Sequence, residues 1–320
     1  MPTVIDQLYD VLDELAMLYY NHQVGQNPHY MYLEGLTLAL STINEQRIAL
    51  KGLDSENSDL IKNHIKEFNE INFTNEELRK ALFLLEIKAY KHAHWGLDAM
   101  MPDGVAIIFT FLLECLHLEH NATILDLTLK NANLSMVLAT YLKGDYTLMG
   151  IEKNHKLCLY DEQKANLLEV PLAIRFQDSL KFSYSNVDAI VGDLTNEEYV
   201  NNYYSSPLYD EGVRDFCYLA IEKHLASGDD DTLAFYLVDA DFFSLANKDL
   251  FKKHFAKDGF FKAIITLPPN FFLGEPKMIV VVAKNNSKYQ KRTSIFTMPN
   301  YDDQDNWQKT LIKIKNDMGE

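Results

Sequence analysis

The sequence predicts an α/β protein in which an N-terminal all-helical domain precedes a seven-stranded, mostly parallel sheet. Two observations support this prediction. Apolar residues recur at helical spacing over about the first 95 of the 320 residues, and from residue 122 short apolar runs alternate with helical segments. A chain of this length with 47% hydrophobic residues can form more than one core. We expect a helical domain at 1–95, a sheet domain at 96–285 and a C-terminal extension at 286–320.

The first domain is expected to contain four amphipathic helices. In the first of them, Leu8 and Leu15 lie on one face and acidic residues on the other. Thr74-Asn75-Glu76-Glu77 is typical of a helix start, with a threonine N-cap and acids in the first turn. The helices are predicted at residues 3–20, 34–48, 56–69 and 75–91. Their charged faces are interpreted as solvated surface, with an interaction surface as the alternative.

The composition narrows the classes of partner and location. With 46 acidic and 30 basic residues, the formal net charge is -16, so tight DNA or RNA binding by the isolated chain is disfavoured. Cys115, Cys158 and Cys217 form no CxxC pair, which is typical of a reduced, cytoplasmic protein. The N-terminus is acidic, and no apolar run approaches the roughly 20 residues of a membrane span. We therefore expect no signal peptide and no membrane association.

The histidines between residues 92 and 120 do not predict a metal site. His92 and His94 lie at the end of a predicted helix, and His117 and His120 lie near the end of another, predicted at 104–118. The HExxH pattern is absent, and no further Cys or His cluster completes a ligand set. We interpret these histidines as surface or cap residues and expect no bound metal.

Seven strands are expected after residue 120, with helices in the gaps between the first six. The strands are predicted at residues 123–126, 147–152, 172–176, 189–191, 233–238, 261–266 and 278–282. The last two are joined by residues 267–277, which contain Pro268, Pro269 and Gly274 and are too short for a crossover helix. These two strands should therefore pair antiparallel.

Acidic residues follow the first three predicted strands. Asp126, Glu152 and Asp178 would lie at their carboxyl ends, where open α/β sheets bind ligands. Three carboxylates could accept hydrogen bonds from an amine, a ribose and an adenine amino group, which suits the cationic cofactor S-adenosylmethionine. A pyrophosphate would need a glycine nest, and no GxGxxG exists in the chain, so a nicotinamide dehydrogenase is disfavoured. Solvated caps at the strand ends are the alternative.

Four short motifs occur in one order along the chain, over about residues 90–285. They are Met100-Met101-Pro102-Asp103, Ile124-Leu125-Asp126-Leu127-Thr128-Leu129-Lys130-Asn131-Ala132-Asn133-Leu134, Phe176-Gln177-Asp178-Ser179-Leu180 and Ile264-Ile265-Thr266-Leu267-Pro268-Pro269-Asn270-Phe271-Phe272. These motifs resemble T-P-x, D-P-A-C-G-T-G-N-L, H-x-D-x-L and I-x-L-P-x-x-x-F of class I S-adenosylmethionine-dependent methyltransferases that methylate adenine amino groups in DNA. The resemblance is to the modification subunits of type I restriction systems and to the stand-alone YtxK-like group.

The resemblance implies a Rossmann-like methyltransferase sheet with S-adenosylmethionine as cofactor. The cofactor-binding residues that it implies are Pro102, Asp126, Thr128, Asn133, Glu152 and Asp178. Asp193 would hold the substrate amine, and the ring of Tyr199, or of Tyr203 or Tyr204, would stack on a flipped base. The catalytic residues expected from the resemblance are therefore Asp193 and Tyr199.

The chain departs from the family pattern in two places. Lys130 and Ala132 stand where the family has two glycines, and Leu127 replaces a proline. Asp193-Leu194-Thr195-Asn196 stands where the family has [DN]-P-P-[YF], and Thr195 is the larger departure because smaller relatives relax the motif to D-L-P. The sequence thus predicts either a methyltransferase, with activity that is weak or lost, or a non-catalytic binding module with the same fold. In the first case the Lys130 side chain must point away from the cofactor.

Partners remain open at this stage. Nucleic acid is a candidate by resemblance, although no separate target-recognition domain is evident. The only dense basic group near the C-terminus consists of Lys284, Lys288, Lys291 and Arg292. It could contact phosphates or, equally, protect the preceding hydrophobic strand from aggregation. A protein partner or a homodimer is the other expectation.

Overall fold

The computed structural model describes residues 2–118, 121–197, 199–201, 205–272 and 274–318. The chain divides into two compact units that interleave along the sequence. The helical unit comprises residues 1–100, 130–132 and 154–174, and the sheet unit comprises residues 101–129, 133–153 and 175–320.

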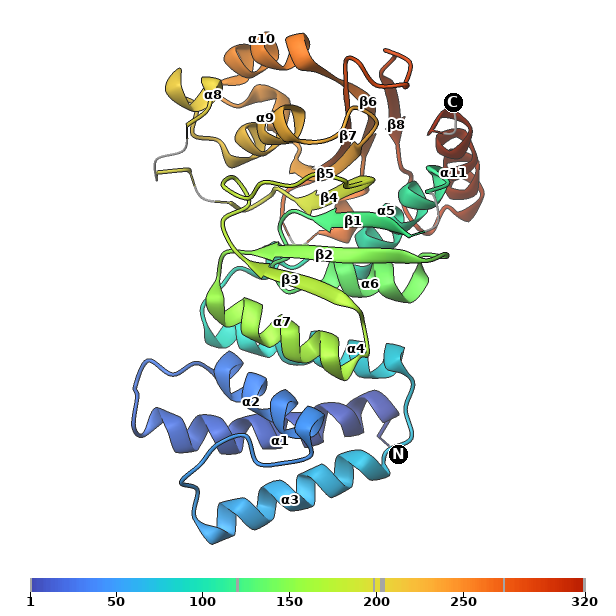
Figure 1. The fold of residues 1–320 in the computed structure, drawn as a ribbon. Coiled ribbons are helices and arrows are strands. Elements are labelled where there is room, and N and C mark those ends of the chain that lie inside the picture. Colours follow the sequence, from blue (N-terminus) through green and yellow to red (C-terminus); the bar gives the residue numbers. More distant parts are fainter. Residues whose placement is uncertain (1, 119–120, 198, 202–204, 273, 319–320) are drawn as a thin grey trace. The chain divides into compact units, whose positions relative to one another are not determined.

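Five α-helices make up most of the helical unit (Figure 1). They are α1 (Val4–Val24), α2 (Tyr32–Glu45), α3 (Ser55–Glu70), α4 (Asn75–His92) and α7 (His155–Leu167). Helix α1 packs against α2, α3 and α4, and α2 also packs against α7. Capping boxes at Thr3 and Thr74 begin α1 and α4, because each threonine accepts from a backbone N–H three residues later. The four predicted helices of the first domain are therefore present.

The sheet has eight strands in the order β3-β2-β1-β4-β5-β7-β6-β8 (Figure 1). They are β1 (Ala122–Asp126), β2 (Tyr146–Glu152), β3 (Leu172–Phe176), β4 (Ala189–Asp193), β5 (Leu233–Asp239), β6 (Gly259–Thr266), β7 (Lys277–Lys284) and β8 (Ser294–Thr297). Strand β7 is antiparallel to both β5 and β6. The α/β class and the antiparallel pairing of β6 with β7 are thus confirmed.

The predicted strand count of seven is wrong by one, because β8 pairs with β6 in parallel. This strand has only four residues, and its Ile295 is 72% exposed. So short a segment shows no sustained alternation of apolar and polar residues, which is why the sequence pattern does not reveal it.

Helices connect the strands as predicted, except between β3 and β4. The described residues of the sheet unit form α5 (Asp103–Cys115), α6 (Asn133–Tyr141), α8 (Pro207–Asp210), α9 (Phe216–Ser227), α10 (Lys248–Asp258) and α11 (Gln304–Met318). Short 3-10 helices occur at η1 (Leu97–Ala99), η2 (Phe242–Ser244) and η3 (Pro269–Phe271). The expectation of a helix between β3 and β4 is wrong, since residues 177–188 form turns and irregular chain. Asp178 caps a turn there, and Asn186 adopts a left-handed backbone.

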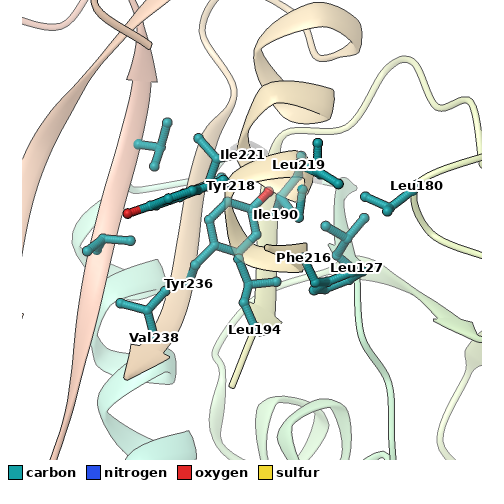
Figure 2. Packing of buried hydrophobic residues seen from close by; sticks show 14 of the residues in the cluster. Leu127, Leu180, Ile190, Leu194, Phe216, Tyr218, Leu219, Ile221, Tyr236 and Val238 are labelled. Carbon is teal, nitrogen blue, oxygen red and sulfur yellow. The ribbon is translucent and has the colours of Figure 1, made fainter. Parts of the chain in front are cut away.

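One hydrophobic core cluster of the sheet unit packs α9 and α10 against β4 and β5. Figure 2 shows Ile190 and Tyr236 of these strands packed with Tyr218 and Leu219 of α9. The ring of Tyr218 also stacks on Phe251 of α10, with 4.1 Å between the ring centroids. This packing fixes the strand ends that carry the candidate site. In the described part of the chain, every helix is too short or too polar to span a bilayer.

Candidate functional site

Asp126 ends β1 and closes the turn that follows it. The side chain is buried, with 2% of its surface exposed. Its Oδ2 accepts a hydrogen bond of 2.9 Å from Ser135 Oγ, and its Oδ1 accepts one of 3.3 Å from the Thr128 N–H. A carboxylate can accept several hydrogen bonds at once, so these contacts are compatible with the predicted amine-binding role, which stays a prediction. Asp126 therefore shapes the turn from the position at which a cofactor amine was predicted.

The turn keeps a glycine-like backbone without glycine. Lys130 has φ 53° and Ala132 has φ 55°, so both residues are left-handed. For a residue with a Cβ atom this conformation costs about 1–2 kcal/mol. These are the two positions at which the family resemblance expects glycine. Lysine and alanine therefore adopt here a backbone that glycine adopts readily. The direction of the Lys130 side chain stays a prediction.

Backbone hydrogen bonds hold the first part of the turn against the sheet. The Leu127 N–H donates to Val191 O at 2.8 Å, and the Leu129 N–H donates to Ile151 O at 2.9 Å. The first of these bonds could not form with the proline that the family has at residue 127, because proline lacks the N–H. Leu127 therefore adds a hydrogen bond to β4 that proline could not make, but it lacks the restricted backbone of proline.

Asn133 joins the start of α6 to the start of α5. Its Nδ2 donates to Met101 O and to Asp103 Oδ1, both at 2.9 Å, and the side chain is 1% exposed. Pro102, the N-cap residue of α5, lies between these two acceptors in the chain. The structure therefore brings two predicted cofactor residues, Pro102 and Asn133, to one place. Their contact with a cofactor stays a prediction.

Glu152 and Asp178 follow β2 and β3 as predicted, but their surroundings differ. Glu152 is 6% exposed, whereas the Asp178 side chain is 38% exposed and accepts a 3.0 Å hydrogen bond from the Leu180 N–H. Both carboxylates act on Lys153. Burial lowers the pKa of the Lys153 ammonium, but the carboxylates of Glu197, Glu152 and Asp178 outweigh it and raise that pKa. The carboxylates at the ends of β2 and β3 are therefore close enough to act on the same lysine.

Asp193 ends β4 and is bound by its neighbour. Its Oδ1 accepts hydrogen bonds from the Thr195 N–H at 3.0 Å and from Thr195 Oγ1 at 2.6 Å, and the side chain is 3% exposed. The Thr128 hydroxyl accepts from the Asp193 N–H at 2.8 Å and donates to its carbonyl at 3.0 Å. Thr128 therefore links the turn after β1 to the loop after β4.

Sequence reasoning missed the partner of Thr195. Lys277 at the start of β7 is 5% exposed, and its Nζ donates to Thr195 Oγ1 at 2.8 Å. The same ammonium lies 5.4 Å from the centroid of the Phe272 ring. Thr195 and Lys277 are 82 residues apart, and no local pattern distinguishes a buried lysine from an exposed one. The Asp193 carboxylate thus belongs to a chain of buried hydrogen bonds.

A cavity of about 260 Å³ opens beside this loop. Its polar side chains include four carboxylates, Glu197, Asp215, Asp239 and Asp241, and its aromatic walls are Tyr199, Phe216 and Phe242. Tyr199 is 66% exposed, and its role as a stacking residue stays a prediction, whereas Tyr203 and Tyr204 lie outside the described residues. The residues that line this cavity include no lysine or arginine. Its charge therefore favours neutral or cationic groups over phosphate.

Cys217, which also lines this cavity, has the surroundings of an unreactive thiol. Burial, with the Asp215 carboxylate as the second cause, raises the pKa of the Cys217 thiol to about 12. A thiol with such a pKa is almost entirely protonated at neutral pH. As for metals, no group of three His, Cys, Asp or Glu side chains among the described residues could hold an ion, and His120 lies outside them.

Comparison with solved structures places this geometry in a known fold. A candidate class I S-adenosylmethionine-dependent methyltransferase from Listeria monocytogenes superposes with a TM-score of 0.81 at 22% identity, over 98% of this chain and 99% of that one. The methyltransferase subunit of a type I restriction-modification system from Streptococcus thermophilus superposes with a TM-score of 0.63 at 14% identity, over 98% and 74% of the two chains.

The type IIG restriction endonuclease BpuSI matches over 98% of this chain and 40% of its own, with a TM-score of 0.57 and 13% identity. No protein-family model matches the sequence, and its comparison with curated proteins gives no match. At these identities the structural likeness establishes the fold, which is that of class I S-adenosylmethionine-dependent methyltransferases and includes restriction-modification subunits. The fold suspected from the four motifs is therefore confirmed.

Proposed function

We propose that this chain binds S-adenosylmethionine and is a methyltransferase of the adenine amino-methylase type. The observation that carries the proposal is the left-handed backbone at Lys130 and Ala132. Two strained residues persist in a folded chain only where the surrounding structure maintains them, and such strain concentrates at functional sites. The turn after β1 is where class I sheets receive a nucleotide cofactor.

The residues of the sheet unit suit the polar groups of this cofactor. Asp126 would bind the amino group, Glu152 the ribose hydroxyls and Asp178 the adenine amino group. When bound, S-adenosylmethionine supplies an electrophilic methyl group. Asp193 would then hold the acceptor amine in line with that group, and Tyr199 would stack on the acceptor ring. Cysteines without disulfides are compatible with action in the cytoplasm.

The acidic cavity beside Asp193 limits which methyl acceptors the isolated chain can bind. Four carboxylates without a basic residue would repel the phosphates of a duplex. We therefore expect the isolated chain to bind duplex DNA weakly and with strong dependence on salt. In a fluorescence anisotropy titration at physiological salt, submicromolar affinity would contradict this expectation. If a DNA adenine is the acceptor, a basic protein partner would have to supply the phosphate contacts.

Calorimetry with S-adenosylmethionine tests the cofactor assignment. Glu152→Ala should weaken binding by roughly ten- to a hundredfold, because a charge-assisted hydrogen bond is worth about 1.5–3 kcal/mol and about 1.4 kcal/mol is a factor of ten. Asp193→Ala is the matched control, since it removes a buried carboxylate that would contact the acceptor and not the cofactor. Binding that survives Glu152→Ala unchanged would disprove the placement of the ribose.

A non-catalytic binding module is the second candidate function. The hydrogen bonds from Thr195 to Asp193 Oδ1 favour it, because one oxygen of the expected catalytic carboxylate is already bound. In that case the wild-type protein would show neither binding heat nor a thermal shift with millimolar S-adenosylmethionine. Retained binding without methyl transfer to any amine acceptor would indicate a fold that keeps the cofactor and has lost the chemistry.

A further inference from the structure

The middle of the cofactor turn belongs to the helical unit and contacts a buried ion pair there. Glu86 on α4 and Lys164 on α7 lie 2.6 Å apart, and their side chains are 1% and 0% exposed. Tyr160 also donates to Glu86 Oε1, at 2.8 Å. A buried ion pair is costly to desolvate and is often replaceable by apolar residues without loss of stability. Its presence here is therefore better explained by what it positions.

Both members of this pair bind the same turn residue. Asn131 Nδ2 donates to Glu86 Oε2 at 2.8 Å, and Lys164 Nζ donates to the Asn131 carbonyl oxygen at 2.9 Å. One bond fixes the Asn131 side chain and the other fixes its backbone. Asn131 is 2% exposed and stands between the two left-handed residues Lys130 and Ala132. Fixing this one residue restrains the peptide planes on both sides of it.

We propose that Glu86 and Lys164 are positioning residues for the cofactor turn. They hold residues 130–132 in the left-handed conformation that glycine would adopt readily, and they do so without touching the cofactor. This proposal rests on the proposed function, because it assigns cofactor affinity to the shape of that turn. It predicts that the ion pair matters when the turn lacks glycine and matters little when glycine is restored.

Cofactor titrations of the wild type, the Lys130→Gly/Ala132→Gly background and three further variants test the proposal. Glu86→Gln should weaken S-adenosylmethionine binding by at least tenfold. The same substitution in a Lys130→Gly/Ala132→Gly background should change binding by less than threefold, because glycine needs no external restraint. Asn131→Ala leaves the ion pair intact and should also weaken binding, which keeps the test valid if Glu86→Gln does not fold. An equal loss in both backgrounds would overturn the proposal.

The chain offers a matched control in Asp13→Asn. Asp13 of α1, like Glu86, binds one lysine and one tyrosine, with 2.5 Å from Lys88 Nζ and from the Tyr32 hydroxyl to its Oδ1. It binds no residue of the turn in the described structure. Asp13→Asn should therefore leave cofactor affinity within about threefold even where it lowers the melting temperature as much as Glu86→Gln does. If Asp13→Asn weakened cofactor binding as much as Glu86→Gln does, the loss would reflect general destabilisation, and the proposal would be overturned.

Hydrogen exchange separates failure of this proposal from failure of the proposed function. In protein without cofactor, Glu86→Gln should accelerate amide exchange across residues 129–133 by at least tenfold, and Asp13→Asn should not. If the wild type does not bind S-adenosylmethionine, the proposed function fails and this measurement alone decides whether the ion pair restrains the turn. Unchanged exchange in Glu86→Gln would overturn the proposal in either case.

Discussion

The turn after β1 and the loop after β4 depart from the family pattern in opposite ways. The turn has lost both glycines, yet Lys130 and Ala132 keep the left-handed backbone. The loop has kept its acidic residue, yet the Asp193 carboxylate is bound by Thr195. The turn thus has a glycine-like backbone with side chains that differ from the family pattern. The loop has the acidic residue of the family pattern, but hydrogen bonds within the chain occupy one of its oxygens.

This contrast predicts which step, cofactor binding or methyl transfer, would be weakened first. A cofactor turn acts through its backbone, so external restraint can replace glycine. A catalytic carboxylate acts through its free acceptor positions, so each internal hydrogen bond competes with the acceptor amine. If activity is weakened in this chain, we expect the loss at the loop after β4 and retained cofactor binding at the turn after β1.

The largest expected effect is on methyl transfer. Asp193→Ala should lower the rate by roughly 100- to 1000-fold, the usual loss when one group that holds the reacting atoms is removed, and should leave the dissociation constant of S-adenosylmethionine nearly unchanged. Single-turnover assays with amine acceptors measure the first effect and calorimetry the second. Asp210→Ala, an exposed carboxylate on α8, is the control. If Asp193→Ala weakened cofactor binding as strongly as it slows methyl transfer, the turn and the loop would not have separate roles.

Acidification should act on the loop side before it acts on the turn. His224 of α9 is fully buried, and burial, followed by the charge of Lys284, lowers its pKa to about 3. Its two ring nitrogens have no hydrogen-bond partner among the described residues. The unfolded chain takes up a proton near pH 6.5, whereas the folded chain does so only near pH 3. Stability from this group is therefore complete above about pH 6.5 and declines as pH falls.

The expected decline is about 1.4 kcal/mol per pH unit between about pH 6 and pH 3. Urea unfolding at a series of pH values measures it, and His224→Leu should flatten the slope, whereas the exposed His29→Gln should not. Because α9 begins with Phe216 and Cys217, which line the cavity beside the loop, hydrogen exchange should rise there first. Earlier opening of residues 129–133 would contradict this order.

Thr195→Val tests the hydrogen-bond chain behind the loop. The substitution preserves shape and removes the hydroxyl that joins Asp193 to the Lys277 ammonium. The two hydrogen bonds of this hydroxyl involve charged, buried partners, so their loss should lower the free energy of unfolding by about 1–3 kcal/mol. Thr123→Val on β1, whose hydroxyl makes no hydrogen bond to the described residues, should change stability little. An unchanged unfolding curve would show that the hydrogen bonds of the Thr195 hydroxyl do not stabilise the fold in solution.

The smallest expected effect is on the turn. Lys130→Gly and Ala132→Gly should each stabilise the fold by about 0.5–1 kcal/mol, because relief of about 1–2 kcal/mol of left-handed strain exceeds the entropy that glycine loses. Thermal unfolding measures the change. Ala139→Gly inside α6 should have the opposite sign, since its backbone is helical. Destabilisation by either turn variant would show that the turn is not strained.

Local patterns in the sequence were sufficient for most of the fold. The apolar runs that became β1 to β7 are each complete within a few residues, and the helix starts at Thr3 and Thr74 need only side chains three positions away. The positions of Asp126, Glu152 and Asp193 at strand ends follow from those same runs. The four-residue β8 is too short for such a pattern, and the predicted helix before β4 was wrong.

The sequence by itself therefore determined which residues reach the carboxyl edge of the sheet, because strand periodicity depends on neighbours in the chain. Only the tertiary structure decided what those residues contact. Asn131 meets Glu86 across 45 residues, and Thr195 meets Lys277 across 82. The left-handed backbone of Lys130 and Ala132, which intrinsic preference opposes, coincides with such distant contacts around Asn131, and no local pattern records them.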